Sequence, residues 1–303
     1  MRSVIRASLV GVLAVSAVAL SSQMSAWANP VHPAAATPSA TISGTPRVGS
    51  TLICTVSPAT TRIRWYFSSS STVLENTATW ELPYQALGRE IVCGTATARS
   101  APVTVLPGLF TNSTKPTMTG ASATHVAVLG KVLTAQPGVW QPEGAATFSY
   151  VWKRGATVVS RAATYKSVAL DLGKALVLTT TATRLGFTTL HASSLPVTVK
   201  GAFTVLAPVS MAGLTGPTQA SPGKALTAST FSFSPTPTSY KYVWSLIDSS
   251  HLNGVVVWSG TTAAYATYTP QAADRGKLVK LTVYAYKANY VTKSSTSARA
   301  GIS

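Results

Sequence analysis

The acidic side chains of this 303-residue chain are too few and too scattered to form the common catalytic groupings. A hydrolase needs a nucleophile beside a base, or two paired carboxylates, and the sequence holds no G-x-S-x-G, H-E-x-x-H or P-loop pattern. No two of the seven acidic residues share a short motif; they are Glu75, Glu81, Glu90, Glu143, Asp171, Asp248 and Asp274. We therefore expect no catalytic residue and no enzymatic activity.

The histidines also lack the spacing of metal ligands. They are His32, His125, His191 and His251. The acidic residues form no D-x-D-x-D calcium loop. Asp171 and Asp274 each precede a glycine by two residues, a pattern typical of a turn in which the carboxylate accepts backbone hydrogen bonds. We expect no metal site and no cofactor.

Two cysteines, Cys54 and Cys93, remain for redox chemistry. Their compartment follows from the N-terminus, where Arg2 and Arg6 precede an apolar run and an Ala-Trp-Ala cleavage pattern ending at residue 28. Residues 1–28 are therefore predicted to be a signal peptide, with a retained anchor as the alternative. No later segment or C-terminal tail predicts a membrane span. We expect a secreted, extracellular product in which the two cysteines form a disulfide.

Basic charge dominates the composition, with a formal net charge of +17 and only 10% charged residues. Residues 29–107 contain five basic and three acidic residues. Residues 108–207 contain nine basic and two acidic residues, and residues 208–303 contain eight basic and two acidic residues. A surplus of that sign concentrates polyanions near the second and third segments, although it also serves solubility alone. The candidate binding positions are Lys153, Arg154, Arg161, Lys166, Lys277, Lys280 and Lys287.

Two tryptophans are candidate binding platforms. Trp140 and Trp258 lie outside the repeated core positions, and an exposed aromatic ring is a common surface for sugars or proteins. Trp258 ends an unusual segment that also contains His251 and Asn253. Its Asn-Gly pair before an apolar run predicts a two-residue hairpin, either as a plain edge hairpin or as a binding loop.

A sequence pattern that occurs three times, here called the repeat frame, indicates the strands that must position all of these residues. One element is an aromatic residue, a Gly eight positions later and an apolar residue or Cys five further on; it occurs at Trp80, Gly88 and Cys93, at Tyr165, Gly173 and Leu178, and at Tyr268, Gly276 and Leu281. A second element is a Gly followed five residues later by Cys54, Ala135 or Ala228. Between the two lies a Trp in each copy: Trp65, Trp152 and Trp244.

The repeat frame pairs the cysteines and divides the chain. Cys54 and Cys93 occupy the positions that are apolar in the other copies, as expected of two facing core sites. Alternating apolar and polar residues predict strands throughout. We expect an all-β chain of three tandem immunoglobulin-like sandwiches, over residues 29–107, 108–207 and 208–303, with short linkers over residues 106–115 and 200–212.

The second copy carries the most complete pattern, with Gly138-Val139-Trp140, Tyr150-Val151-Trp152-Lys153-Arg154-Gly155 and Asp171-Leu172-Gly173. This pattern resembles the Ig-like repeats of secreted and surface proteins of actinobacteria. The third copy lacks the G-x-W, and the first lacks both that and the Asp. Such repeats occur appended to enzymes, in adhesins and alone, so the resemblance implies a fold rather than one function.

Two kinds of function remain open. The favoured one is a cell-surface-associated binding or spacer protein that engages an anionic cell-wall polymer, a polysaccharide or a host polyanion. The alternative is a secreted partner of a surface protein, such as an inhibitor or a subunit of an assembly, which docks through strand edges or the hairpin of the third copy. Nucleic acid is a poor third choice because the chain is exported and has no recognition motif.

Overall fold

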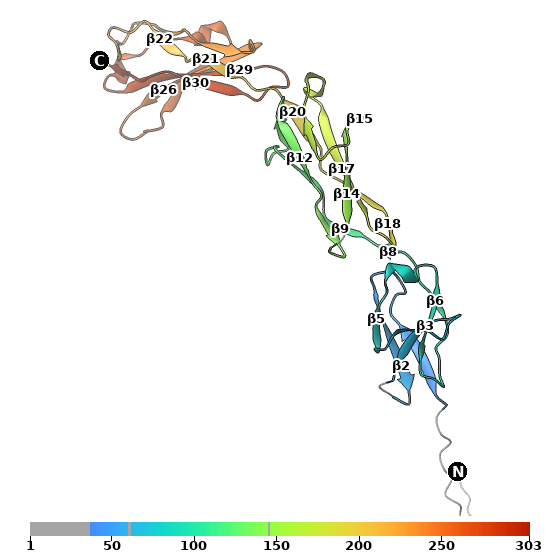
Figure 1. The fold of residues 1–303 in the computed structure, drawn as a ribbon. Coiled ribbons are helices and arrows are strands. Elements are labelled where there is room, and N and C mark those ends of the chain that lie inside the picture. The colour runs from blue at the N-terminus through green and yellow to red at the C-terminus, as the bar shows by residue number, and fades with distance from the viewer. Residues whose placement is uncertain (1–36, 60–61, 145) are drawn as a thin grey trace, which may run out of the picture.

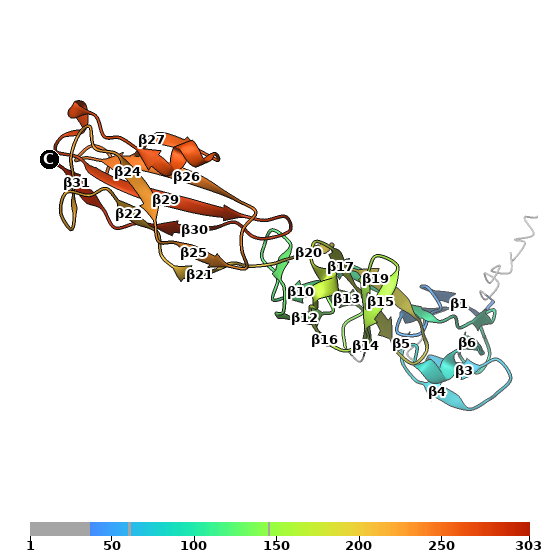
Figure 2. The same cartoon turned by 90° about the horizontal axis from the view of Figure 1, so that it is seen from above.

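The computed structural model describes residues 37–303, apart from residues 60, 61 and 145. The regular structure of these residues consists of β-strands and four short 3-10 helices. The strands form three sandwiches that follow one another end to end in both views (Figure 1, Figure 2). The predicted all-β fold is confirmed, whereas the predicted signal peptide lies outside the described residues.

The first module packs a three-stranded sheet against a four-stranded sheet. The three-stranded sheet contains β1 (Ser39–Ser43), β2 (Thr51–Ser57) and β5 (Thr79–Glu81). The four-stranded sheet has the order β4 (Val73–Glu75), β3 (Arg64–Phe67), β6 (Glu90–Gly94) and β7 (Val103–Thr104), and the short helix η1 spans Tyr84–Ala86. Strict alternation along β2 places Leu52, Cys54 and Val56 in the core, because neighbouring side chains of a strand point to opposite faces.

The second module repeats this arrangement with more strands. Its small sheet contains β10 (Thr117–Thr119), β12 (Val132–Gln136) and β16 (Thr164–Lys166). Its large sheet contains β11 (Val126–Val128), β20 (Val197–Lys200), β17 (Ala175–Thr183), β14 (Thr147–Arg154), β15 (Thr157–Ser160) and β19 (Leu190–Ser193), with η2 at Ala169–Asp171. Two short pairs add to it: β9 (Thr111–Thr114) with β13 (Val139–Gln141), and β8 (Gly108–Leu109) with β18 (Phe187–Thr188).

The third module matches the second. Its small sheet contains β22 (Ser210–Ala212), β24 (Leu226–Ser229) and β28 (Thr267–Tyr268). Its large sheet contains β23 (Gln219–Ala220), β31 (Ala300–Ile302), β29 (Leu278–Tyr286), β26 (Ser239–Ile247), β27 (Val255–Gly260) and β30 (Lys293–Thr296). The remaining elements are the pair β21 (Thr204–Ala207) with β25 (Ser232–Ser234), and the helices η3 (Ala263–Ala266) and η4 (Ala272–Asp274).

The segments predicted as linkers are mostly strands of the following module. β9 pairs with β13 of the second module, and β21 pairs with β25 of the third. The third module therefore begins before residue 208, the boundary that the sequence pattern suggested. Sequence patterns missed these strands because their partners, β13 and β25, lie in the irregular stretch before the core tryptophan.

One tryptophan anchors each core, as the repeat frame predicted. Trp65, Trp152 and Trp244 are fully buried. Each indole Nε1 donates a hydrogen bond to a backbone carbonyl across the sandwich, to Thr77 O at 2.9 Å, Ala162 O at 2.8 Å and Tyr265 O at 3.0 Å. A buried indole N–H without a partner would be costly, so these bonds fix the orientation of the ring.

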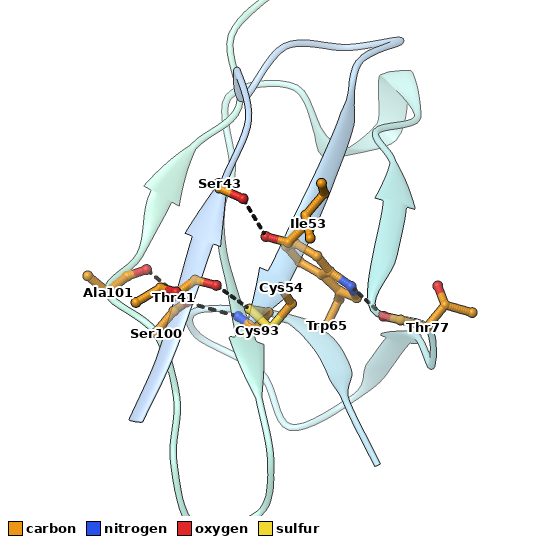
Figure 3. The surroundings of a disulfide bond; sticks show 9 residues. All are labelled: Thr41, Ser43, Ile53, Cys54, Trp65, Thr77, Cys93, Ser100 and Ala101. Atoms are coloured by element: carbon orange, nitrogen blue, oxygen red, sulfur yellow. Dashed lines mark hydrogen bonds between the residues drawn. A yellow bond between two sulfur atoms is a disulfide. The ribbon is translucent and has the colours of Figure 1, made fainter. Parts of the chain in front are cut away.

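The predicted disulfide joins the two sheets of the first module beside Trp65 (Figure 3). The Cα atoms of Cys54 and Cys93 are 6.0 Å apart, within the range of ordinary disulfides. The equivalent strand positions in the other modules hold Ala135 with Leu178 and Ala228 with Leu281, and all of these are buried or half-buried. The two cysteines therefore replace an apolar contact between sheets with a covalent one.

An aspartate closes the corner before the long strand in the second and third modules. Asp171 accepts hydrogen bonds from Val168 N at 2.8 Å and from the Tyr165 hydroxyl at 2.7 Å. Asp274 does the same with Gln271 N and the Tyr268 hydroxyl, both at 2.8 Å. The backbone-binding role that the sequence predicted for these aspartates is confirmed.

Alkaline pH is expected to destabilise the second and third modules selectively. Burial and then the hydrogen bond to Asp171 raise the pKa of Tyr165 to about 12, and the same causes raise the pKa of Tyr268. An unfolded tyrosine ionises at about pH 10, so stability present below that pH is lost as the pH rises through the folded pKa. Denaturant unfolding at increasing pH should show this loss, and a Tyr165→Phe, Tyr268→Phe variant should lose stability less steeply. The first module has Trp80 at this position and serves as the internal control. An equally steep loss in the double variant would contradict the assignment.

Candidate functional surfaces

Phe187 connects the first and second modules. It lies at the tip of the hairpin between β17 and β19, and it packs against the core of the first module. Its ring centroid is 5.1 Å from that of Phe110, and the Arg184 guanidinium lies 4.7 Å from its centre. The backbone adds a parallel pairing of β18 with β8, including a 2.9 Å bond from Gly108 N to Gly186 O. Ring and strand together hold the two modules end to end.

Tyr290 lies on the corresponding hairpin of the third module, where its ring packs on that module's own core and beside the linker residue Gly201. Its centroid is 5.1 Å from that of Phe203, and the Lys287 ammonium lies 5.5 Å from its centre. Gly201 N donates to Asn289 O at 2.9 Å, and Gly201 forms a parallel bridge with Tyr290. We call each of these two connections an aromatic clamp.

Glycine is required in the linker of each clamp. A Cβ on Gly108 would lie 2.6 Å from the Phe187 ring, and one on Gly201 would lie 2.3 Å from the Tyr290 ring. Such distances are shorter than any real Cβ contact, so even alanine would displace the ring.

A second tier of aromatic residues supports each clamp. In the second module Trp140 lies 6.3 Å from Phe110 and 5.9 Å from Phe148, measured between centroids. In the third module Phe233 lies 6.2 Å from Phe203 and 6.2 Å from Tyr240. We call this tier, built on β9 and β13 or on β21 and β25, the collar. Phe233 takes the place of Trp140, which explains why the third copy can lack the G-x-W.

The collar corrects the expectation for Trp140. The sequence suggested an exposed platform, but Trp140 is 5% exposed and donates its Nε1 hydrogen to Pro137 O at 2.7 Å. It packs in the collar because the strand β13 turns the ring toward Phe110. Its side chain is not open to a ligand.

The repeat pattern of the sequence did not predict the aromatic clamps. A signal was present: Gly-x-Phe in both linkers, with a basic residue three positions before the clamp ring, at Arg184 and Phe187 and at Lys287 and Tyr290. The sequence does not reveal that the two halves touch, because Phe110 and Phe187 lie 77 positions apart and Phe203 and Tyr290 lie 87 positions apart.

The hairpin of the third module forms the exposed edge of its large sheet. Among the described residues β27 pairs only with β26, and Val255, Val256, Val257 and Trp258 are all more than a third exposed. Trp258 stacks on Tyr265 with centroids 4.9 Å apart. The predicted edge hairpin is thus present, with Trp258 partly open to solvent.

The turn of this hairpin is longer than the two residues expected from Asn-Gly. It spans residues 248–254, between the end of β26 and the start of β27. Asp248 organises it by accepting hydrogen bonds from Ser250 N, His251 N and His251 Nδ1, at 2.8 to 3.0 Å. Lys280 Nζ then donates to Asn253 O at 2.8 Å and ties the turn to the sheet.

Four of the seven candidate basic residues are held by the protein itself. Arg154 pairs with the buried Asp171 at 2.7 Å, Lys277 pairs with Asp274 at 3.5 Å, Lys280 binds Asn253 O, and Lys287 donates to Thr236 O at 3.3 Å. Lys153, Arg161 and Lys166 are exposed, and none of them has a salt bridge within the described part of the chain. The seven lie on two different modules.

The described residues contain no cluster of three or more His, Cys, Asp and Glu side chains suited to a metal ion. Nor does any helix in this part of the chain have the length and apolar character to cross a membrane. Nothing in the geometry of these residues points to catalysis.

No known protein family and no curated protein matches this sequence. Solved structures of tandem-domain proteins align over most of its length. The D1–D4 ectodomain fragment of ICAM-5 is 14% identical, covers 88% of this chain and 77% of its own, and has a TM-score of 0.41. Three N-terminal domains of the outer capsid protein Hoc of bacteriophage RB49 are 15% identical, with 84% and 93% covered and a TM-score of 0.30. A Ca²⁺-stabilised adhesin with which an Antarctic bacterium binds ice is 10% identical, with 87% and 73% covered and a TM-score of 0.28.

These matches agree with the fold class, and at TM-scores of 0.28 to 0.41 they support no other conclusion. The sheets themselves, with a core tryptophan between them and a disulfide across the first pair, define the class. The chain is a tandem array of three immunoglobulin-like β-sandwiches. Its resemblance to Ig-like repeats is thereby confirmed, and an actinobacterial origin stays a prediction.

Proposed function

We propose that this chain is a secreted, non-enzymatic spacer and binding protein of a cell surface, held there by an anionic wall polymer or polysaccharide. The observation that carries the proposal is the pair of aromatic clamps, whose ring and backbone contacts join the three modules end to end (Figure 1). A protein whose task needed independent modules would have no use for interlocked junctions. A disulfide favours an oxidising, extracellular compartment.

The charge distribution supports attachment through the second and third modules. Nine basic residues against two acidic ones in residues 108–207, and eight against two in residues 208–303, make the attraction to polyanions mainly theirs. Lys153, Arg161 and Lys166 are the candidates whose side chains are free of salt bridges in the described structure. The second module is therefore the stronger candidate for the anchoring surface.

The full chain should bind isolated cell walls at low salt and elute as ionic strength rises, because exposed charges are screened over about 8 Å at physiological salt. Replacing Lys153, Arg161 and Lys166 by Gln should lower the salt concentration needed for elution. The matched control exchanges Lys153 and Lys166 for Arg and Arg161 for Lys, and it should elute like the unmodified protein. Salt-insensitive retention would overturn electrostatic attachment.

Such retention would favour a second function, docking to a surface protein through β27. This strand presents unpaired backbone groups and an apolar Val-Val-Val-Trp run, the features used in strand addition. An apolar interface of that kind largely survives high salt.

A further inference from the structure

The hairpin that carries the clamp ring in the second and third modules is shortened in the first module. In every module a serine marks the end of this hairpin by accepting a hydrogen bond from the strand before it: Cys93 N to Ser100 Oγ, Leu178 N to Ser194 Oγ and Leu281 N to Ser297 Oγ. The two residues are 7 positions apart in the first module and 16 in each of the others. The clamp hairpin is thus nine residues shorter in the first module.

A tight turn replaces that hairpin. Thr95 N bonds to Ala98 O at 2.8 Å, and Thr95 Oγ1 accepts from Thr97 N and Ala98 N at 3.3 and 3.1 Å. Gly94 is necessary for it, since a Cβ there would lie 2.0 Å from Ala98 O. The turn is therefore held in one conformation by its own hydrogen bonds.

A hollow of about 380 Å³ lies beside this turn. The start of β1, the end of β2 and the start of β3 form its other walls. The volume falls within the range of small-molecule sites, about 300 to 1,000 Å³. In the second and third modules this end of the sandwich carries the collar and clamp hairpin.

The lining of the hollow combines three kinds of group. Hydroxyls come from Ser39, Ser57, Thr95 and Thr97, apolar surface comes from Pro38, Val56 and Pro58, and positive charge comes from Arg62 and Arg64. None of the described residues that line it is acidic. The Arg64 side chain is exposed and makes no hydrogen bond or ion pair among the described residues, whereas Arg62 already has an interaction partner.

We infer that this hollow binds an acidic sugar. The Arg64 guanidinium receives the sugar carboxylate, because its planar fork of N–H donors matches a carboxylate. The hydroxyls pair with those of the sugar, and the proline and valine surfaces cover its C–H face. The site is separate from the charged surfaces of the second and third modules, so it does not depend on the proposed anchoring.

Isothermal titration of the full chain with a glucuronic-acid disaccharide tests the assignment, with a glucose disaccharide and inorganic phosphate as comparisons. We expect saturable binding of the acidic disaccharide alone. Arg64→Ala should weaken it at least about tenfold, since a hydrogen bond to a charged group is lost. Arg64→Lys should recover only part, because it keeps the charge and loses the fork.

Arg299→Ala is the matched control, an exposed arginine of the third module, and should bind as the unmodified protein does. Circular dichroism of both variants checks that they fold. Absence of saturable binding, equal binding of the glucose disaccharide, binding of phosphate alone, or an equal loss in both alanine variants would each overturn the inference.

Discussion

Replacing Phe187 and Tyr290 by alanine is expected to convert the fixed array of three modules into a chain of loosely connected modules. Fully burying a Phe side chain contributes about 1.5 to 3 kcal/mol. Phe187 makes part of this contact with the core of the first module, and the Tyr290 ring packs beside Gly201 of the linker. The backbone bonds at Gly108 and Gly201 remain, so the modules stay folded while their relative angle varies. Small-angle scattering should show a broader distribution of interatomic distances and a smaller radius of gyration.

A matched control changes two exposed residues of the same hairpins. Leu185 is 68% exposed and Val291 42%, so Leu185→Ala with Val291→Ala should leave the scattering profile unchanged. An unaltered profile in the clamp variant as well would mean that the strand pairing alone holds the junctions. In that case Gly108→Ala and Gly201→Ala would be the variants that release them.

Removal of the disulfide should destabilise the first module by about 4 kcal/mol and leave the other two unchanged. The value follows from the chain entropy of a closed loop of 39 residues. Cys54→Ala with Cys93→Leu is the informative variant, because it copies the pair found in the second module. Hydrogen exchange followed by mass spectrometry should show faster exchange in β2, β3 and β6, with no change in peptides of the other modules.

Chemical reduction of the unmodified protein is the control for the new side chains and should give the same pattern. Protection of β2 and β6 that is unaffected by both treatments would show that the sheets hold without the cross-link. A loss that spreads into the second module would instead mean that Phe187 needs an intact first core.

The repeat frame could be predicted because its residues face one core in each copy. A buried tryptophan and the two strand positions beside it restrict side-chain type in every module, so their spacing survives in the sequence. The facing pair Cys54 and Cys93 could be assigned for the same reason, by comparison with apolar residues at matching positions.

The side chains that lie opposite Cys54 and its counterparts on the neighbouring strand could not be predicted. Ile42 lies opposite Cys54, whereas Met118 lies opposite Ala135 and Met211 opposite Ala228. A long methionine fills the space that a small alanine leaves, which requires knowledge of the strand register. The hollow of the first module was missed for a related reason, since it follows from nine absent residues.

The disulfide also decides how the protein would respond to a pulling force. Residues 54 to 93 form a covalent loop, so they cannot contribute to the length of a stretched chain even when the first module has lost its fold. The disulfide therefore shortens the contour length of the stretched chain by about 130 Å, which is 39 residues at roughly 3.4 Å each. The second and third modules have no such limit, and under load they would be the extensible part of the tether.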